Sequence, residues 1–283
     1  LPTYADIGNS IRSIFVPEKD CTWGCFDYSQ QEPRLVVHYA LQSSCMGVGE
    51  IAKKYQNPPF DLQTGILKPI DFHQIIADMA NISRKRAKTI NLGLFYGMGV
   101  NKLQGELGLG TYDEAKKTLD LYHARVPFVK QLMQSTMKRA QETGKIRTLL
   151  GRLCRFHMWE PKRFGRHKAM SWEDAIREHQ PDEIKRAFTY KALNKLIQGS
   201  AADMTKKAML ELYKEGIIPH VQVHDELDIS VENDKQAEKI TKIMEEAVTL
   251  KIPNKVDYEK GENWGTIHDL KDKDENGYDL AED

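Results

Sequence analysis

The sequence predicts an α+β fold in which a small antiparallel sheet, covered by helices, accompanies a largely helical region. Residues 22–27 form a short apolar run that ends at a carboxylate, which suits a buried strand. Residues 221–231 place apolar alternation on both sides of a charged centre, which indicates a β-hairpin. Helical periodicity dominates residues 71–143. Strand segments near both ends of the chain therefore enclose a helical middle.

A helix is expected to follow the first strand. Pro33 suits a first helical position, because its missing N–H group is not needed there. Apolar side chains recur behind it at helical spacing, which gives the helix one buried face. These side chains are Leu35, Val36, Tyr39 and Ala40.

Later elements follow from breaker residues and periodicity. Chain breaks are expected at Asn57-Pro58-Pro59, near residues 105–111 and at Pro127. A second long helix is predicted over residues 183–214, and an amphipathic helix over 236–250 closes the fold. The tail after Trp264 is predicted to be poorly ordered.

The composition is that of an ordinary globular protein. With 40% hydrophobic and 29% charged residues in a chain of 283, one large or two modest domains are expected. Apolar runs stay well short of the roughly 20 residues that a membrane helix needs, and the first residues lack a signal-peptide pattern. We therefore expect a cytoplasmic protein without a membrane partner.

Cysteine spacing argues against a zinc site. The chain has neither paired CxxC motifs nor a histidine cluster beside them. We expect free, buried thiols instead. The residues concerned are Cys21, Cys25, Cys45 and Cys154.

Charge is balanced overall but unevenly distributed. The formal net charge is zero and the pI is about 7.3, which gives no global sign of a nucleic-acid partner. A basic stretch comprises Lys145, Arg147, Arg152, Arg155, Lys162, Arg163, Arg166 and Lys168. The acidic end comprises Asp269, Asp274, Glu275, Asp279, Glu282 and Asp283. Balanced totals can hide a basic groove, although such a stretch is also typical of a solvated face.

The first chemical motif lies where the first strand meets its helix. Asp27 ends the strand, and a carboxylate there can reach a metal ion to which the backbone carbonyl of Tyr28 adds a further oxygen. A lone aspartate at such a junction is more often a helix cap or a turn residue. The motif therefore gains meaning only together with others.

The second motif is a stripe on one helix. Arg84, Lys88, Leu92 and Tyr96 are spaced by four and share a slowly rotating face. Its two cations suit a triphosphate and its aromatic end suits a base or a sugar. Taken alone, the pattern also fits a solvated basic start that merges into a core face. Glycines at 93 and 97 each cost about 1 kcal/mol in a helix, which indicates close approach by another group or a flexible helix end.

The third motif is His224-Asp225-Glu226 at the predicted hairpin tip. Neighbouring carboxylates repel one another unless solvent or a cation screens them, and an exposed turn is the simpler interpretation. If Asp225 faces Asp27, the pair can hold two Mg²⁺ ions. One ion would lower the pKa of an attacking hydroxyl and the other would neutralise a leaving pyrophosphate, as nucleotidyl transfer requires.

In this order the three motifs resemble those of family A DNA polymerases, the family of bacterial DNA polymerase I and of many phage enzymes. Further similar segments are Asp71-Phe-His73, residues 144–152, residues 194–203 and Gly261-Glu-Asn-Trp264. The likeness covers nearly the whole chain, and Gln30-Gln31-Glu32-Pro33 is similar to phage versions. It implies a palm over residues 1–50 and 183–265, fingers over 51–182 and an acidic tail over 266–283.

The resemblance also implies roles for individual residues. Asp27, Tyr28 and Asp225 would hold two Mg²⁺ ions, and Asp27, Asp225 and Lys88 would be catalytic. Nucleotide-binding residues would be Gln30, Glu32, His73, Arg84, Lys88, Leu92 and Tyr96, with Glu32 as the steric gate against ribose. DNA-binding residues would be Arg147, Arg152, Asn194, Gln198, His224 and Glu226. The implied partners are primer-template DNA and deoxynucleoside triphosphates, in the cytoplasm of a bacterial host if a phage encodes the chain.

Two departures from the family pattern follow. Leu92 stands where the family usually has Phe or Tyr, which leaves a smaller sugar-facing surface without a ring. The family's thumb, exonuclease domain and earliest palm strands are expected before Leu1, either in a longer chain or on a separate polypeptide. An alternative is therefore a DNA-binding subunit of a split polymerase that is inactive alone. A related RNA polymerase is disfavoured by Glu32.

Overall fold

The computed structural model describes residues 4–59, 70–163, 165 and 167–271. These residues belong to two compact units, which are described separately below. The sheet unit combines Leu1–Gln31 with Met204–Asp283, and the helical unit is Glu32–Asp203. The chain passes between them inside two helices, α2 (Gln31–Gln42) and α10 (Ala192–Lys214).

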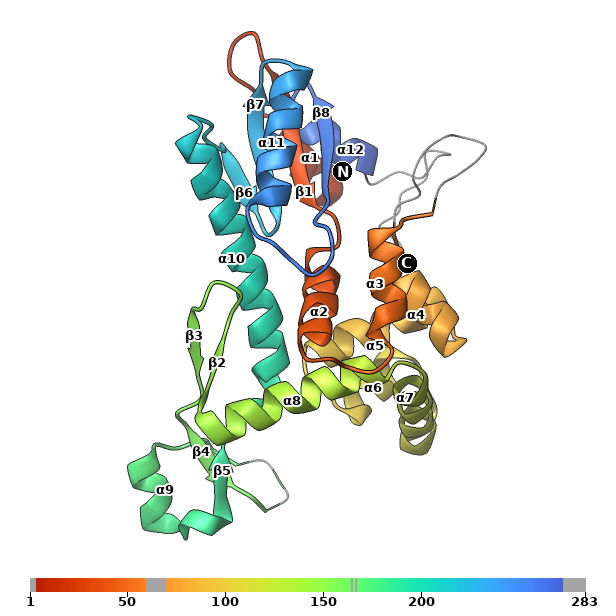
Figure 1. The fold of residues 1–283 in the computed structure, drawn as a ribbon, viewed down its shortest axis with the longest axis vertical. Coiled ribbons are helices and arrows are strands. Elements are labelled where there is room, and N and C mark those ends of the chain that lie inside the picture. Colours follow the sequence, from red (N-terminus) through yellow and green to blue (C-terminus); the bar gives the residue numbers. More distant parts are fainter. Residues whose placement is uncertain (1–3, 60–69, 164, 166, 272–283) are drawn as a thin grey trace. The chain divides into compact units, whose positions relative to one another are not determined.

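The sheet unit is built on four antiparallel strands in the order β6-β7-β1-β8 (Figure 1). Their bounds are β1 (Thr22–Tyr28), β6 (Val221–Val223), β7 (Glu226–Val231) and β8 (Val256–Gly261). The central strand β1 pairs Asp27 with Glu226 on one side and with Asp257 on the other. The predicted strand and hairpin are therefore confirmed, and they are neighbours in one sheet.

Helices cover both faces of this sheet. Strand alternation puts Trp23 and Cys25 on one face, where they form a core with Ile267 of α12 (Trp264–Lys271). Tyr28 lies on the other face, and its hydroxyl donates to the carbonyl oxygen of Met244 in α11 (Asp234–Glu246) over 2.6 Å. A further helix, α1 (Tyr4–Arg12), packs against α12. The ends of β1 are thus fixed by contacts on both sides.

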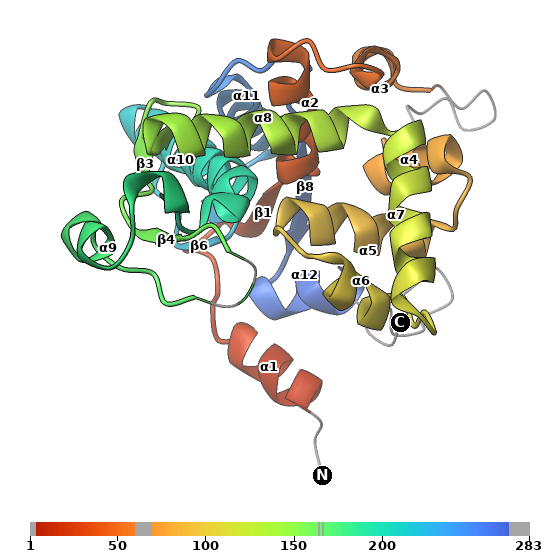
Figure 2. The ribbon, with the colours of Figure 1, turned by 90° about the horizontal axis from the view of Figure 1, so that it is seen from below.

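The helical unit contains a run of helices, and from residue 72 onward those that follow one another in sequence pack together (Figure 2). Their bounds are α3 (Val48–Gln56), α4 (Phe72–Ala80), α5 (Arg84–Phe95), α6 (Val100–Glu106), α7 (Tyr112–Arg125) and α8 (Pro127–Thr143). Side chains of Asp71, Ser83 and Thr111 cap α4, α5 and α7, each accepting a hydrogen bond from the amide three residues on. The helical middle is confirmed, with additional breaks at Asn81 and Tyr96.

Two small hairpins complete the helical unit. Strand β2 (Lys145–Arg147) pairs with β3 (Leu153–Arg155), and β4 (Trp159–Pro161) pairs with β5 (Ile184–Arg186). Helix α9 (Trp172–Glu178) lies between β4 and β5 in sequence, and the short 3₁₀ turns η1 (Pro181–Glu183) and η2 (Thr189–Lys191) flank β5.

Three local predictions were wrong. The helix expected over 183–214 begins only at Ala192, because residues 184–186 leave the helical path to pair with β4. The tail after Trp264 was expected to lack order, but α12 extends to Lys271 because its Ile267 is buried in the core. The closing helix runs from Asp234 to Glu246, since Asn233 caps it earlier than the apolar pattern indicated.

The expectation of buried thiols holds for Cys25 and Cys45, whereas Cys21 and Cys154 are half-buried. All four are free. Among the described helices, none is long and apolar enough to cross a membrane. Arg166 of the basic stretch and residues 272–283 of the acidic tail lie outside the described residues.

Candidate functional site

The two aspartates proposed from the sequence lie on adjacent segments of the sheet unit. Asp27 is half-buried near the end of β1, and Asp225 is half-buried in the turn before β7. The amide of Tyr28 donates to the carbonyl oxygen of Asp225 over 3.4 Å, one step beyond the pair of Asp27 with Glu226. The backbone therefore holds both carboxylate-bearing residues at the same end of the β1–β7 ladder.

A left-handed residue shapes the turn that carries Asp225. His224 is exposed and has φ 52°, and its carbonyl oxygen accepts from Nε2 of Gln222 over 2.7 Å. Because this residue interrupts the extended backbone, the strict alternation of β7 does not extend back to Asp225.

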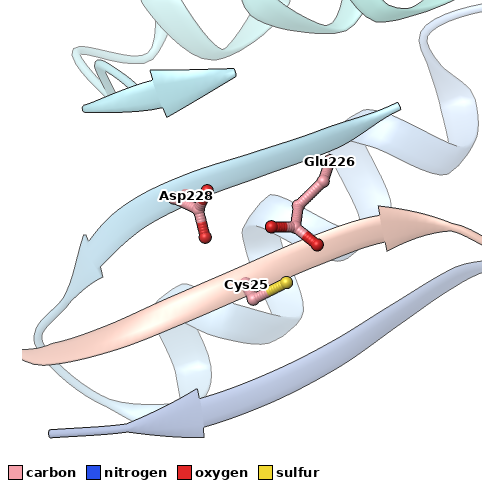
Figure 3. Close-up of side chains that lie close together, drawn as sticks. All are labelled: Cys25, Glu226 and Asp228. Carbon is pink, nitrogen blue, oxygen red and sulfur yellow. The ribbon is translucent and has the colours of Figure 1, made fainter. Parts of the chain in front are cut away.

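Strand register gathers further carboxylates on one face of the sheet. Residues paired across antiparallel strands share a face, so Glu226 and Asp257 flank Asp27, while Asp228 and Glu259 flank Cys25. Figure 3 shows the side chains of Cys25, Glu226 and Asp228 pointing toward one another. One ligand atom of each lies within 4.8 Å of the others, and all three residues are buried.

Indole groups satisfy part of this acidic face. Nε1 of Trp23 donates to Asp228 over 3.0 Å, and Nε1 of Trp264 donates to Glu226 over 3.4 Å. Glu226, at 7% exposure, is thus an inward-facing residue, and the DNA contact inferred for it from the sequence stays a prediction. Cys25 and Asp228 were not predicted from the sequence to lie beside the site, although each is two residues from Asp27 or Glu226 and so shares its face of the strand.

The ligand atoms of the pair Asp27 and Asp225 differ from those of the buried cluster formed by Cys25, Glu226 and Asp228. Mg²⁺ prefers oxygen donors, and the set formed by the carboxylates of Asp27 and Asp225 with the Tyr28 carbonyl offers only oxygens. The buried cluster contains the soft Cys25 thiol, which Mg²⁺ does not favour. The residues named from the sequence therefore fit a hard divalent cation, and the cluster behind them does not.

In the helical unit, the first residue of α5 forms an ion pair with the residue that caps α4. Nε of Arg84 lies 2.6 Å from Oδ2 of Asp71, whose other oxygen accepts from the Gln74 amide over 3.0 Å at the start of α4. Burial alone would raise the pKa of Asp71, but hydrogen bonds from Arg84 and Gln74 outweigh it and lower the pKa. Arg84 and Lys88 are both exposed.

His73 lies half-buried beside these cations. Burial lowers the pKa of His73, and the charges of Arg84 and Lys88 lower it further against the opposing effect of Asp71. Its Nδ1 lies 3.0 Å from Nδ2 of Asn91 on α5. The structure thus brings together His73, Arg84 and Lys88, which the sequence placed in one nucleotide site.

Tyr96 ends α5 beside the predicted steric gate. It is the C-cap residue with 47% exposure, and its hydroxyl shares side-chain hydrogen bonds with Glu32 and Gln198. Partial burial and the charge of Glu32 raise the pKa of this hydroxyl. Leu92 is half-buried on the same helix.

Gly97 accounts for the sharp end of α5. It has φ +72°, and a Cβ there would lie 2.9 Å from the carbonyl oxygen of Tyr190. Both the left-handed backbone and the close approach require glycine, as the sequence indicated.

The residues predicted to contact DNA differ in burial and in hydrogen bonding. Arg152 bonds within the helical unit, to Asp203 over 2.9 Å and to the Gly199 carbonyl over 2.6 Å. Arg147 donates to the Gly151 carbonyl over 2.9 Å. Asn194 is half-buried and Gln198 is exposed on α10. In the sheet unit, Gln30 is half-buried with φ 53°. Roles for these residues in binding stay predictions.

Comparison with known proteins assigns the sequence to a family. The sequence model described as DNA polymerase family A matches residues 1–266. The chain is 36% identical over 294 residues to a DNA-directed DNA polymerase of Pseudomonas phage M6, which covers 90% of this chain and 40% of the relative. It is 32% identical over 280 residues to DNA polymerase I of Geobacillus stearothermophilus, covering 93% of this chain and 28% of the relative.

A solved structure is similar in fold and sequence. The POL domain of Pol1 from M. smegmatis, in complex with DNA primer-template and dNTP, matches with a TM-score of 0.68 and 26% identity. The match covers 93% of this chain and 44% of that one. The chain thus spans less than half the length of each of these similar proteins.

Proposed function

Because the chain belongs to DNA polymerase family A, we propose that it adds deoxynucleotides to a primer 3′ end under the direction of a DNA template. The observation that carries the proposal is the backbone link between Tyr28 and Asp225, which keeps Asp225 beside the strand end that bears Asp27. Primer-template DNA and deoxynucleoside triphosphates are the proposed partners, as in the complex of the similar POL domain.

The proposed reaction transfers a nucleotide from its triphosphate to the 3′ end of the primer. The primer 3′ hydroxyl loses its proton to solvent and its oxygen forms a bond to the α-phosphorus. The bond from that phosphorus to the pyrophosphate oxygen breaks, and pyrophosphate leaves. Bound Mg²⁺, in the two-metal form of the mechanism, would lower the pKa of the 3′ hydroxyl and neutralise charge on the leaving group. The chain's own part is to present the oxygens of Asp27, Tyr28 and Asp225.

The helical unit supports binding of the triphosphate. Arg84 and Lys88 are exposed cations whose charges lower the pKa of the nearby His73. The three residues therefore form a group of hydrogen-bond donors for phosphate oxygens. Lys88 is also suited to donate a proton to the departing pyrophosphate. We propose that residues 51–182, within the helical unit, form the fingers, and that residues 1–50 and 183–265 form the palm.

Sugar selection is proposed to depend on Glu32. Its hydrogen bond with the Tyr96 hydroxyl would hold the carboxylate where a ribose 2′-hydroxyl would clash. Gln198 shares that hydroxyl and would steady the same arrangement. We further propose that Arg147, Arg152 and Asn194 of the helical unit contact DNA. In the sheet unit, His224 and Glu226 are proposed to contact DNA and Gln30 to contact the nucleotide.

Primer extension on a defined template tests this function. The natural chain should incorporate the deoxynucleotide that the template codes for, and should reject the matching ribonucleotide. Glu32→Ala should raise ribonucleotide incorporation, whereas Glu50→Ala, an exposed carboxylate of α3, should not change it. Duplex binding without template-coded extension would instead support a DNA-binding role.

A further inference from the structure

A chain of buried side-chain hydrogen bonds joins three helices of the helical unit. Tyr122 of α7 donates to Oδ1 of Asn91 on α5, and Nδ2 of Asn91 lies 3.0 Å from Nδ1 of His73 on α4. Asn91 is 0% exposed and Tyr122 is 1% exposed. Burying an amide and a phenol is costly unless their polar atoms are satisfied. Each of these two finds its partner in this chain of bonds.

The direction of the chain follows from Tyr122. Burial raises the pKa of the Tyr122 hydroxyl, so the hydroxyl keeps its proton. Over the residues that the structure describes, Asn91 is the polar partner of this hydroxyl, which is therefore satisfied as a donor to Oδ1. The amide nitrogen of Asn91 must then face His73.

This orientation selects one form of the His73 ring. The Asn91 NH₂ group can only donate, so Nδ1 of His73 must accept, and a neutral imidazole that accepts at Nδ1 carries its proton on Nε2. Protonation would place an Nδ1–H group against the amide hydrogens. Asp71 at the start of α4 favours the charged form, whereas burial and the charges of Arg84 and Lys88 on α5 disfavour it. The group from α7 that takes part in this chain of hydrogen bonds is the Tyr122 hydroxyl, which is uncharged.

We propose that Asn91 is a positioning residue that holds His73 as a neutral Nε2–H donor for a triphosphate oxygen, with Tyr122 fixing the Asn91 amide. The nucleotide end of this inference rests on the proposed function, because the triphosphate is that of the incoming nucleotide. Arg84 and Lys88 supply charge to the same group, and His73 supplies a directed neutral hydrogen bond. Such a donor keeps its proton through neutral pH.

The ring form can be measured without any nucleotide. Nitrogen NMR of the histidine-labelled chain, with His73 assigned from the spectrum of His73→Gln, reports which ring nitrogen carries the proton. The natural chain should show the Nε2–H form and a His73 pKa below the ordinary value of about 6.5. In Asn91→Asp the carboxylate should accept from Nδ1–H and raise the pKa. An Nδ1–H ring in the natural chain, or an unchanged ring in Asn91→Asp, would overturn the inference.

Extension kinetics test whether the form of the His73 ring affects nucleotide binding. For Asn91→Asp at a pH above the raised His73 pKa, the neutral ring carries its proton on Nδ1 and Nε2 cannot donate. The KM for the deoxynucleotide should then rise about tenfold, the change expected for one strong hydrogen bond, with a smaller change in kcat. Below that pKa the imidazolium donates again from Nε2, so the KM of this variant should fall as the pH is lowered through the His73 pKa. Tyr122→Phe should shift the ring form in part, and Asn101→Asp on the exposed face of α6 should behave as the natural chain.

The two hypotheses fail separately. A natural chain that shows the Nε2–H form but extends no primer contradicts the proposed function alone. A chain that extends primers while Asn91→Asp leaves the KM and its pH dependence unchanged contradicts the positioning role.

Discussion

The backbone amide of Tyr28 donates a hydrogen bond of 3.4 Å to the carbonyl oxygen of Asp225. This bond joins the end of β1 to the turn before β7 through main-chain atoms, next to the paired residues Asp27 and Glu226. Because no side chain takes part in it, isosteric replacement of Asp27 or Asp225 should leave the local backbone in place. Loss of function in such variants can therefore be assigned to the carboxylates.

The Asp71 carboxylate should stabilise the helical unit through two separable contacts. Asp71→Ala removes both the α4 cap and the ion pair with Arg84, and should lower the free energy of unfolding by about 1 kcal/mol. Asp71→Asn keeps a capping oxygen and should cost less. Because the folded-state pKa of Asp71 is lowered, its stabilising effect is present above about pH 4 and is lost as pH falls through the folded pKa. Urea unfolding at pH 7 and pH 3 measures this, and an equal deficit of Asp71→Asn at both values would contradict it.

Gly97 and Gly108 form a matched pair for testing backbone strain. Both have positive φ, at 72° and 62°, but a Cβ at Gly97 meets the Tyr190 carbonyl at 2.9 Å, whereas one at Gly108 meets nothing within 4 Å. Gly108→Ala should therefore cost about 1 kcal/mol for the left-handed backbone alone. Gly97→Ala should cost about 3 kcal/mol, because the backbone must also shift. Similar losses in thermal unfolding would show that the close approach is relieved without cost.

His123 should make the helical unit sensitive to acid. Burial lowers the pKa of His123 to about 4, and the charge of Lys130 contributes. Since the unfolded chain binds the proton near pH 6.5, stability is full above that value and falls as pH drops toward 4, by roughly 3 kcal/mol. His123→Gln should flatten this pH dependence in urea unfolding between pH 7 and 4. A slope equal to that of the natural chain would assign the acid sensitivity to other groups.

Leu92 should alter sugar discrimination. It is half-buried on α5 between the basic end and Tyr96. The resemblance to the family leads us to expect Phe or Tyr at this position. Leu92→Phe should raise the rate of extension and change the ratio of dideoxynucleotide to deoxynucleotide incorporation. Single-nucleotide extension kinetics measure both quantities, and equal kinetics for the two proteins would sink the idea.

Local patterns predicted the elements whose partners are close in sequence or strongly periodic. The β6–β7 hairpin and the helices between Phe72 and Thr143 belong to this group. β1 was recognised from its continuous apolar run instead, although it pairs with residues as distant in the sequence as Val231. The three-residue strand β5 was missed because its pairing with β4 depends on residues more than 20 positions away, and three residues show no periodicity. α12 could have been found, since Trp264 and Ile267 are spaced to share one helical face.

The candidate site was predictable as a collection of motifs but not as a network. Arg84, Lys88 and Tyr96 share a helix, so their spacing was informative. The contact of Asn91 with Tyr122 joins positions that are 31 residues apart, and nothing in either local sequence distinguishes a buried amide from an exposed one. Such polar contacts depend on the packing of α4, α5 and α7, which only the folded chain defines.

We propose that Asp27 and Asp225 together support magnesium-dependent nucleotidyl transfer. The most direct measurement is primer extension in Mg²⁺ by the natural chain and by Asp225→Asn, with Asp234→Asn as a control for loss of an exposed carboxylate in the sheet unit. Extension should disappear when Mg²⁺ is chelated, return when it is restored, persist in Asp234→Asn and be lost in a folded Asp225→Asn. Undiminished extension by Asp225→Asn would contradict the account.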